Sequence, residues 1–154
     1  QDIFSLTDDA ALFKNIINEI SKYVKKESIT KIAGIEARGF IFASAVSFKC
    51  EIPFIPIRKP GKLPGDVVRH KYKLEYGTDQ IEIQKGMINK SDKVLIIDDL
   101  IATGGTALAS YVLMSKLTSK KINYFFIINL KNLGGADKLM KKNTVVRSLY
   151  NTQG

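Results

Sequence analysis

The stretch VLIIDDLIATGGTA, residues 94–107, decides the fold, because it joins an apolar run to a glycine turn and a helical pattern. Four apolar residues lead into two adjacent aspartates, Asp98 and Asp99, and Thr103-Gly104-Gly105-Thr106 follows. A continuous apolar run is typical of a parallel strand that is buried on both faces. The stretch therefore predicts a buried β-strand, a tight turn and the start of a helix.

The remaining sequence repeats this alternation of strands and helices. Strands are expected at residues 31–36, 53–59, 93–99, 123–130 and 145–150. Helices are expected at residues 8–26, 38–49, 104–117 and 136–142, the first capped by Thr7. Pro56 places the second strand at an edge of the sheet. We expect an α/β fold with a mostly parallel five-stranded sheet and helices on both faces, in a single domain over residues 1–154.

Residues 60–81, PGKLPGDVVRHKYKLEYGTDQI, interrupt that rhythm. The segment is rich in proline, glycine and charge, and its apolar periodicity is weak. About 20 residues without a core pattern are long for a connection inside a compact domain, and such loops usually act as lids or binding loops. We predict a mobile lid loop here.

Composition limits the partners and the compartment. The chain has no apolar run of the ~20 residues that a membrane helix needs, and no secretory signal is visible. Its single cysteine, Cys50, excludes an internal disulfide and fits a reducing, cytoplasmic compartment. The net charge is +9, but lysines scattered along the whole chain supply most of it, which argues against a nucleic-acid partner.

The glycine turn has the chemistry of a phosphate site. The first N–H groups of a helix have no partner within the helix, glycines allow close approach of a ligand, and threonines add hydroxyl donors. We therefore assign a phosphate to Ala102, Thr103, Gly104, Gly105 and Thr106. No lysine follows the glycines as in a Walker A loop, and the dinucleotide fingerprint G-x-G-x-x-G is absent.

The aspartates need a different part of the same ligand. Ionised carboxylates only accept hydrogen bonds, so Asp98 and Asp99 suit hydroxyl groups or a hydrated divalent cation. A phosphate with a diol close to it is a ribose 5-phosphate. Other strand ends carry cationic groups: Arg38 with the Gly39 amide, and Arg58, Lys59 and Lys62. These exceed the needs of one phosphate and predict a second, highly charged anion such as pyrophosphate.

These residues resemble the type I phosphoribosyltransferases, and among them the enzymes that act on adenine. The matching motifs are GIEARGFIF (34–42), IRKPGKLPG (57–65), YKLEYGTDQIEIQK (72–85) and VLIIDDLIATGGTA (94–107), and the resemblance extends from about Asp2 to Tyr150. It implies the type I phosphoribosyltransferase fold. The family's Phe-Arg-Asp-Ile segment is matched here only by Gln1-Asp2-Ile3, which implies a small, incomplete hood.

The resemblance also implies a reaction, in which adenine and phosphoribosyl pyrophosphate give AMP and pyrophosphate with Mg²⁺. Substrate phosphates would hold the Mg²⁺, with water-mediated contacts to Asp98 and Asp99 rather than direct protein ligands. Leu100 would line the base pocket, Glu75 would help to move a proton on the purine, and Tyr76 would lie beside it on the lid. Arg38 and the two aspartates would join Glu75 as catalytic residues. A cytoplasmic homodimer is implied.

Two other functions fit parts of the sequence. The phosphate turn and the aspartates are equally compatible with transfer to another purine or to a pyrimidine. A non-enzymatic regulator that senses phosphoribosyl pyrophosphate and binds nucleic acid would suit the positive charge. Glu75 favours an enzyme over this regulator, because a sensor needs no proton-transfer residue.

Overall fold

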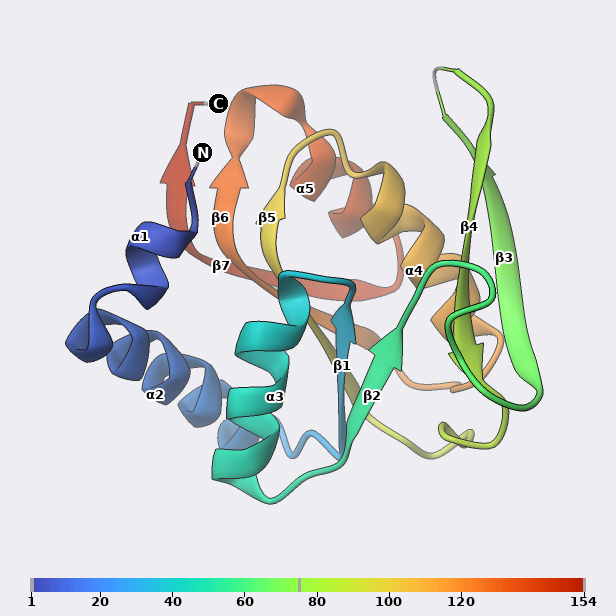
Figure 1. Ribbon diagram of the computed structural model, residues 1–154, viewed down its shortest axis with the longest axis horizontal. Coiled ribbons are helices and arrows are strands. Elements are labelled where there is room, and N and C mark those ends of the chain that lie inside the picture. The colour runs from blue at the N-terminus through green and yellow to red at the C-terminus, as the bar shows by residue number, and fades with distance from the viewer. Residues whose placement is uncertain (1, 75, 154) are drawn as a thin grey trace.

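The computed structural model describes residues 2–74 and 76–153, and its centre is a five-stranded parallel sheet (Figure 1). The strand order is β2-β1-β5-β6-β7. The strands are β1 (Lys31–Ile35), β2 (Phe54–Ile57), β5 (Val94–Ile101), β6 (Ile122–Leu130) and β7 (Thr144–Thr152). This confirms the predicted parallel sheet, and β2 lies at an edge as Pro56 indicated.

Helices cover both faces of the sheet. The short α1 (Phe4–Thr7), α2 (Ala10–Lys26) and α3 (Gly39–Cys50) cover one face, and α4 (Gly105–Ser115) and α5 (Gly135–Met140) cover the other. A 3₁₀ turn, η1 (Lys131–Leu133), connects β6 to α5. Because side chains alternate along a strand, Leu95 and Ile97 pack toward α2 and α3 while Ile96 packs toward α4. Both faces of β5 are therefore buried, as its continuous apolar run predicted.

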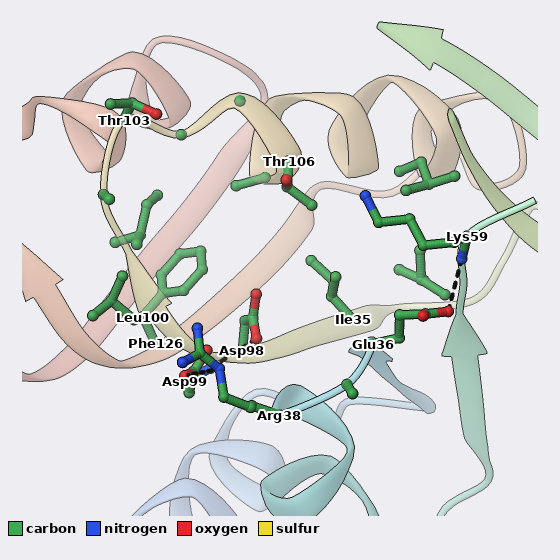
Figure 2. A pocket seen from close by; sticks show the side chains of 18 of the residues that line it. Ile35, Glu36, Arg38, Lys59, Asp98, Asp99, Leu100, Thr103, Thr106 and Phe126 are labelled. Carbon is green, nitrogen blue, oxygen red and sulfur yellow. Dashed lines mark hydrogen bonds and ion pairs between the residues drawn. The ribbon is translucent and has the colours of Figure 1, made fainter. Parts of the chain in front are cut away.

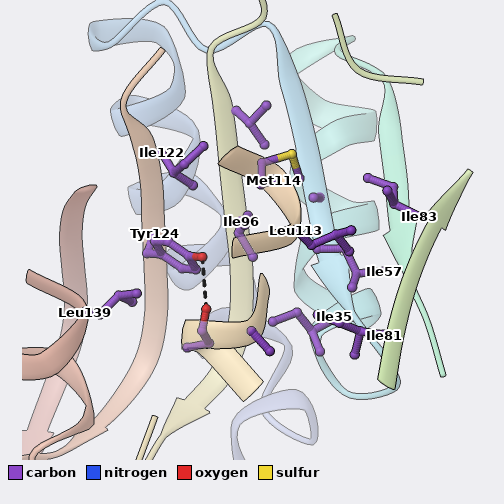
Figure 3. Packing of buried hydrophobic residues seen from close by; sticks show 14 of the residues in the cluster. Ile35, Ile57, Ile81, Ile83, Ile96, Leu113, Met114, Ile122, Tyr124 and Leu139 are labelled. Atoms are coloured by element: carbon purple, nitrogen blue, oxygen red, sulfur yellow. Dashed lines mark hydrogen bonds between the residues drawn. The ribbon is translucent and has the colours of Figure 1, made fainter. Parts of the chain in front are cut away.

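The core beneath α4 also contains a polar contact. Tyr124 is fully buried among Ile96, Leu113 and Met114, and its hydroxyl lies 2.7 Å from that of Ser110 (Figure 3). A buried hydroxyl without a partner would be costly, so this pair allows tyrosine and serine to face each other across the β6–α4 interface. The interface holds α4, and with it the preceding glycine turn, in a fixed position on the sheet.

Residues 60–81 were predicted to form a loop without regular secondary structure, and this part of the prediction was wrong. Strands β3 (Val67–Lys73) and β4 (Thr78–Gln84) form an antiparallel hairpin that packs beside α4 (Figure 1). Ile81 and Ile83 of β4 are buried in the same core as α4. The apolar pattern is weak because few positions of the hairpin are buried, and one of these is the polar Glu82 between Ile81 and Ile83.

The predicted helix over residues 8–26 corresponds to α2, which begins at Ala10, while the short α1 that precedes it was not predicted and the cap differs. Thr7 is the last residue of α1, whereas Asp9 caps α2 by accepting a hydrogen bond from the Leu12 amide at 3.1 Å. Aspartate is among the best N-cap residues, so the prediction of Thr7 as the cap was wrong by two positions. In residues 2–74 and 76–153, no helix has the length and apolar character that crossing a membrane requires.

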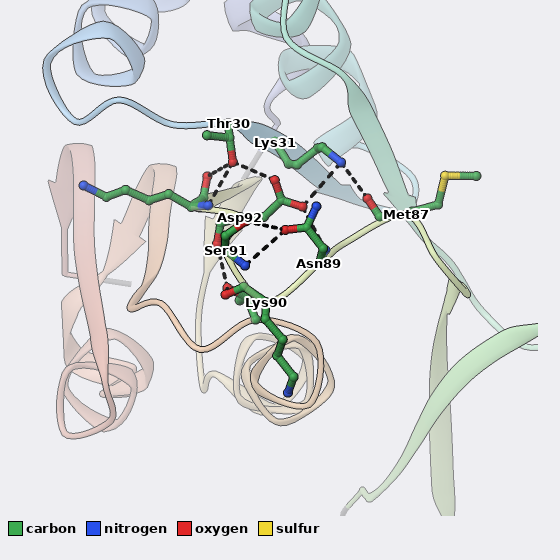
Figure 4. A network of polar contacts seen from close by, with 9 residues as sticks. Thr30, Lys31, Met87, Asn89, Lys90, Ser91 and Asp92 are labelled. Carbon is green, nitrogen blue, oxygen red and sulfur yellow. Dashed lines mark hydrogen bonds and ion pairs between the residues drawn. The ribbon is translucent and has the colours of Figure 1, made fainter.

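The amino ends of β1 and β5 are joined by a polar network around Asp92 (Figure 4). This buried carboxylate accepts hydrogen bonds from the Thr30 hydroxyl at 2.9 Å and the Asn89 amide at 2.8 Å. The Lys31 ammonium lies 3.4 Å from its second oxygen. Burial alone would raise the pKa of Asp92, but these hydrogen bonds and the Lys31 charge lower it below 3.8. Asp92 therefore stays ionised and ties the two strands together.

Candidate active site

The carboxyl ends of β1, β2 and β5 surround one cleft of about 350 Å³ (Figure 2). This is the edge where parallel sheets of this type bind their ligands. The predicted residues that line the cleft are Arg38, Arg58, Lys59, Asp98, Asp99, Leu100, Ala102, Thr103, Gly104, Gly105 and Thr106. Residues from three separate motifs therefore meet at one site.

Other predicted residues of the described chain lie outside this lining. Gly39 packs against β5, where an added Cβ would lie 2.9 Å from Asp98 Oδ1, so it permits close packing of α3 behind the cleft. Lys62 is exposed on the connection to the hairpin, and Tyr76 is 88% exposed at the hairpin turn. Glu75 lies outside the described residues, so its role remains a prediction.

The turn over residues 102–106, where a phosphate is predicted and which we call the phosphate turn, is fixed by its backbone. Gly104 has a φ of +90°, in the left-handed region that favours glycine, and α4 begins at the next residue. The Gly135 amide donates to the Ala102 carbonyl at 3.0 Å. A Cβ on Gly135 would lie 2.4 Å from that carbonyl oxygen and 2.9 Å from the Gly104 Cα. Two glycines thus allow the start of α5 to support the turn from behind.

The two aspartates lie inside β5, and their surroundings differ from that of an ordinary surface carboxylate. Asp98 is half-buried and Asp99 is buried. Asp98 Oδ1 accepts a hydrogen bond from the Asp99 amide at 2.9 Å. Burial, followed by the adjacent Asp99 charge, raises the pKa of Asp98 well above 3.8. The carboxylate of Asp98 is therefore poorly stabilised without a ligand.

Asp99 has an ion-pair partner but retains acceptor capacity. Arg38 Nε lies 2.9 Å from Asp99 Oδ2, yet among the described residues no group is oriented to hydrogen-bond that oxygen. Arg38 was predicted for pyrophosphate, and its pairing with Asp99 occupies one side of the guanidinium, which has five N–H donors. The remaining donors are available to an anion, because the side chain is 52% exposed.

Arg58 and Lys59, which we call the cationic corner, are held by carboxylates at the end of β2. Glu36 Oε1 accepts hydrogen bonds from Arg58 Nε at 3.1 Å and from the Lys59 amide at 2.8 Å (Figure 2). The Lys59 ammonium donates to the Asp79 carboxylate of the hairpin. Two positive side chains are therefore held by carboxylates at the end of β2, in the lining of the cleft.

Sequence reasoning missed several residues that shape this site. Glu36 lies at the same strand end as Arg38, so its position contained a signal that was not used. Asp79 and Tyr72 reach the cleft region only because the hairpin folds beside α4, and the sequence pattern gave no sign of this. Phe126 of β6 is buried and, like Leu100, lines the cleft (Figure 2).

Comparison with known proteins agrees with this geometry. The phosphoribosyl transferase domain model matches residues 5–152. The adenine phosphoribosyltransferase of Pelagibacter ubique is 49% identical over 154 residues, covering 100% of this chain and 88% of the relative.

Solved structures show the same fold. The enzyme from Giardia lamblia, complexed with 9-deazaadenine, has a TM-score of 0.91 at 33% identity and covers 98% of this chain and 85% of its own. The Saccharomyces cerevisiae adenine phosphoribosyltransferase, complexed with adenine and an imino-altritol bisphosphate, has a TM-score of 0.86 at 34% identity, with 96% and 85% covered. The chain therefore belongs to the phosphoribosyl transferase family and, within it, to the group of the adenine phosphoribosyltransferases.

Proposed function

We propose that this protein transfers the phosphoribosyl group of phosphoribosyl pyrophosphate to adenine, giving AMP and pyrophosphate in purine salvage. The observation that supports this most is the convergence of a glycine phosphate turn, two adjacent aspartates and the cationic corner on one cleft. That order of groups matches a ligand with a phosphate, a diol and a pyrophosphate. The complexes of the relatives with adenine and 9-deazaadenine support adenine as the base.

The residues of the cleft have distinct roles in this proposal. Residues 102–106 bind the 5-phosphate at the start of α4, and Asp98 and Asp99 accept hydrogen bonds from the ribose hydroxyls. Positive charge develops on the ribose as the bond to pyrophosphate breaks, and the fixed carboxylates stabilise it. Arg38, Arg58 and Lys59 stabilise the departing anion, and we propose the same role for Lys62, which lies outside the cleft lining on the exposed connection to the hairpin. Leu100, with Phe126, provides an apolar surface for the base.

Mg²⁺ fits this site as a substrate-bound ion. In the described part of the chain, no three histidine, cysteine or acidic side chains cluster to hold a metal ion. Mg²⁺ commonly binds through one or two carboxylates and the phosphates of the substrate, and Asp98 and Asp99 supply such oxygens. When bound, the ion would neutralise charge on the pyrophosphate.

The hairpin and the assembly are part of the same proposal. Residues 60–81, which include β3, the hairpin turn and the start of β4, act as the lid, because the exposed turn carries Tyr76 and Leu74 lines the cleft. Closure of a lid excludes water that would otherwise hydrolyse the activated sugar. The whole chain acts as one phosphoribosyltransferase domain, in a cytoplasmic homodimer.

The test is a panel of free bases with the purified protein, Mg²⁺ and phosphoribosyl pyrophosphate. We expect turnover with adenine and none with guanine, hypoxanthine, xanthine or orotate. Turnover with another base alone would overturn the assignment of adenine. Absence of turnover with every base, combined with tight binding of DNA or RNA, would favour a regulator.

Glu75→Gln tests the proton-transfer role. The amide has nearly the same shape but cannot exchange the proton, so we expect kcat to fall by about 10²-fold or more. The KM for phosphoribosyl pyrophosphate should change little. Glu19→Gln, which alters an exposed carboxylate on α2, is the matched control and should keep wild-type kcat. Wild-type kcat in Glu75→Gln would remove Glu75 from this role.

A further inference from the structure

The side chain of Lys59 is held by the hairpin, although Lys59 itself follows β2. Its ammonium donates to the Asp79 carboxylate of β4 and lies 3.5 Å from the Tyr72 hydroxyl of β3. The same ammonium lies 6.0 Å from the centre of the Tyr72 ring. Figure 2 shows the Lys59 side chain directed toward Thr106. The hairpin therefore determines where this positive charge lies in the cleft.

Tyr72 extends the contact to the phosphate turn. Its hydroxyl lies 3.3 Å from Asp79 Oδ2 and 3.4 Å from the hydroxyl of Thr106. Thr106 belongs to the first turn of α4, where the 5-phosphate is assigned. A continuous set of polar contacts thus links the pyrophosphate end of the cleft to its 5-phosphate end.

We propose that Asp79, assisted by Tyr72, is a positioning residue that holds the Lys59 ammonium ready for the pyrophosphate of the substrate. This inference rests on the proposed function and adds a residue for which the cleft chemistry alone gave no role. Asp79 acts through Lys59 and does not touch the reacting atoms.

The flexibility of lysine explains why such a residue is useful. A lysine side chain has many rotamers, and fixing it before the ligand arrives lowers the entropy that binding must overcome. An ammonium has three donors, so one can contact Asp79 while another faces the anion. The hydrogen bond with Lys59 lowers the pKa of Asp79 below 3.8, and the pair therefore stays charged at neutral pH.

A purely structural role for the pair agrees less well with the geometry. The side chains of Lys59 and Asp79 are 38% and 27% exposed, and ion pairs with that exposure contribute little to stability. The hairpin is held by its seven-residue register and by the buried Ile81 and Ile83. Loss of the Asp79 carboxylate should therefore change binding more than folding.

A double-mutant cycle with Asp79→Ala and Lys59→Ala tests the inference. Asp79→Ala should raise the KM for phosphoribosyl pyrophosphate about tenfold, as expected for loss of a charged hydrogen bond, with kcat changed less than twofold. In the Lys59→Ala background, Asp79→Ala should have no further effect on KM. Additive effects of the two substitutions would overturn the inference, because Asp79 would then act independently of Lys59.

Two further measurements separate this inference from the proposed function. The same cycle is repeated on the affinity for inorganic pyrophosphate, measured by calorimetry, which needs no turnover. Coupling in pyrophosphate binding without adenine turnover would support the inference and contradict the proposed function. Adenine turnover by the wild type, together with additive effects of the two substitutions on pyrophosphate affinity, would support the proposed function and contradict the inference. Glu19→Ala breaks a lysine–carboxylate pair on α2, far from the cleft, and should leave KM and affinity unchanged.

Discussion

The two ends of strand β5 hold their carboxylates in opposite ways. Asp92, just before the amino end, accepts two hydrogen bonds and forms an ion pair with Lys31, and its pKa is lowered. Near the carboxyl end, burial and the adjacent charge of Asp99 raise the pKa of Asp98. The fold supplies hydrogen-bond and charge partners to Asp92, which joins the strands, whereas Asp98 lacks comparable stabilisation without a ligand.

This difference indicates that the amino end of β5 contributes to stability and that its carboxyl end contributes to ligand binding. A charge that is fully paired in the folded protein stabilises it, whereas a poorly compensated charge destabilises it until a ligand supplies partners. Ribose hydroxyls or a hydrated cation would supply such partners to Asp98 and Asp99. The comparison therefore predicts that substitutions at the amino end lower stability, and that substitutions at the carboxyl end chiefly alter binding.

Asp92→Ala should have the largest effect on stability. It leaves the Asn89 amide and the Thr30 hydroxyl without their buried acceptor, and it leaves the Lys31 ammonium with the Met87 carbonyl but no opposite charge. We expect the free energy of unfolding to fall by about 2–4 kcal/mol, measured by urea denaturation at pH 7. The KM for phosphoribosyl pyrophosphate should not change.

The Asp92 contribution should also depend on pH. A lowered pKa means that the stabilisation is present above the ordinary carboxyl value of 3.8 and is lost as the pH falls below it. The difference between wild type and Asp92→Ala should therefore shrink on acidification. Asp66→Ala, which removes an exposed carboxylate, should shift stability by no more than about 0.5 kcal/mol. An equal loss in both variants would contradict the role of the network.

Gly135→Ala should have an intermediate effect on the free energy of unfolding. It acts on the turn that follows the carboxyl end of β5. The new Cβ would collide with the Ala102 carbonyl and with Gly104, so the phosphate turn must shift. We expect a loss of about 1–3 kcal/mol in unfolding free energy and weaker binding of phosphoribosyl pyrophosphate by calorimetry. A Cβ on Gly105 would meet open space, so Gly105→Ala should keep its stability. Unchanged affinity in Gly135→Ala would show that the turn does not depend on α5.

Asp98→Asn should have the smallest effect on stability and the opposite sign. Because the pKa of Asp98 is raised, the folded state binds its proton more tightly than the unfolded state does. Its stabilising contribution is thus present at low pH and is lost as the pH rises above 3.8. The neutral amide avoids this loss, so Tm should rise by a few degrees at pH 7 while affinity for phosphoribosyl pyrophosphate falls. A lower Tm at pH 7, with parent-like affinity, would contradict the comparison.

Much of the fold and part of the site could be predicted from the sequence. The continuous apolar run before Asp98 predicted a strand buried on both faces, and Pro56 predicted the edge, because both depend on local chemistry. The β3–β4 hairpin was missed, because few of its positions are buried and one of these, Glu82, is polar. The support of the phosphate turn by Gly135 was also missed, because no local pattern shows which segments approach each other.

The sequence by itself determined the five strands of the parallel sheet and the helices α2 to α5, together with the glycine turn and the adjacent aspartates, because these follow from periodicity, glycine placement and ionisable groups along the chain. Only the tertiary structure decided that Asp99 meets Arg38, that Glu36 orients the cationic corner, and that Asp79 holds Lys59. These pairings join residues that are 20 to 61 positions apart in the chain, and the packing of the strands and the hairpin brings them together. Such pairs position charged side chains at the cleft, and the exposed ones among them contribute little to the stability of the fold.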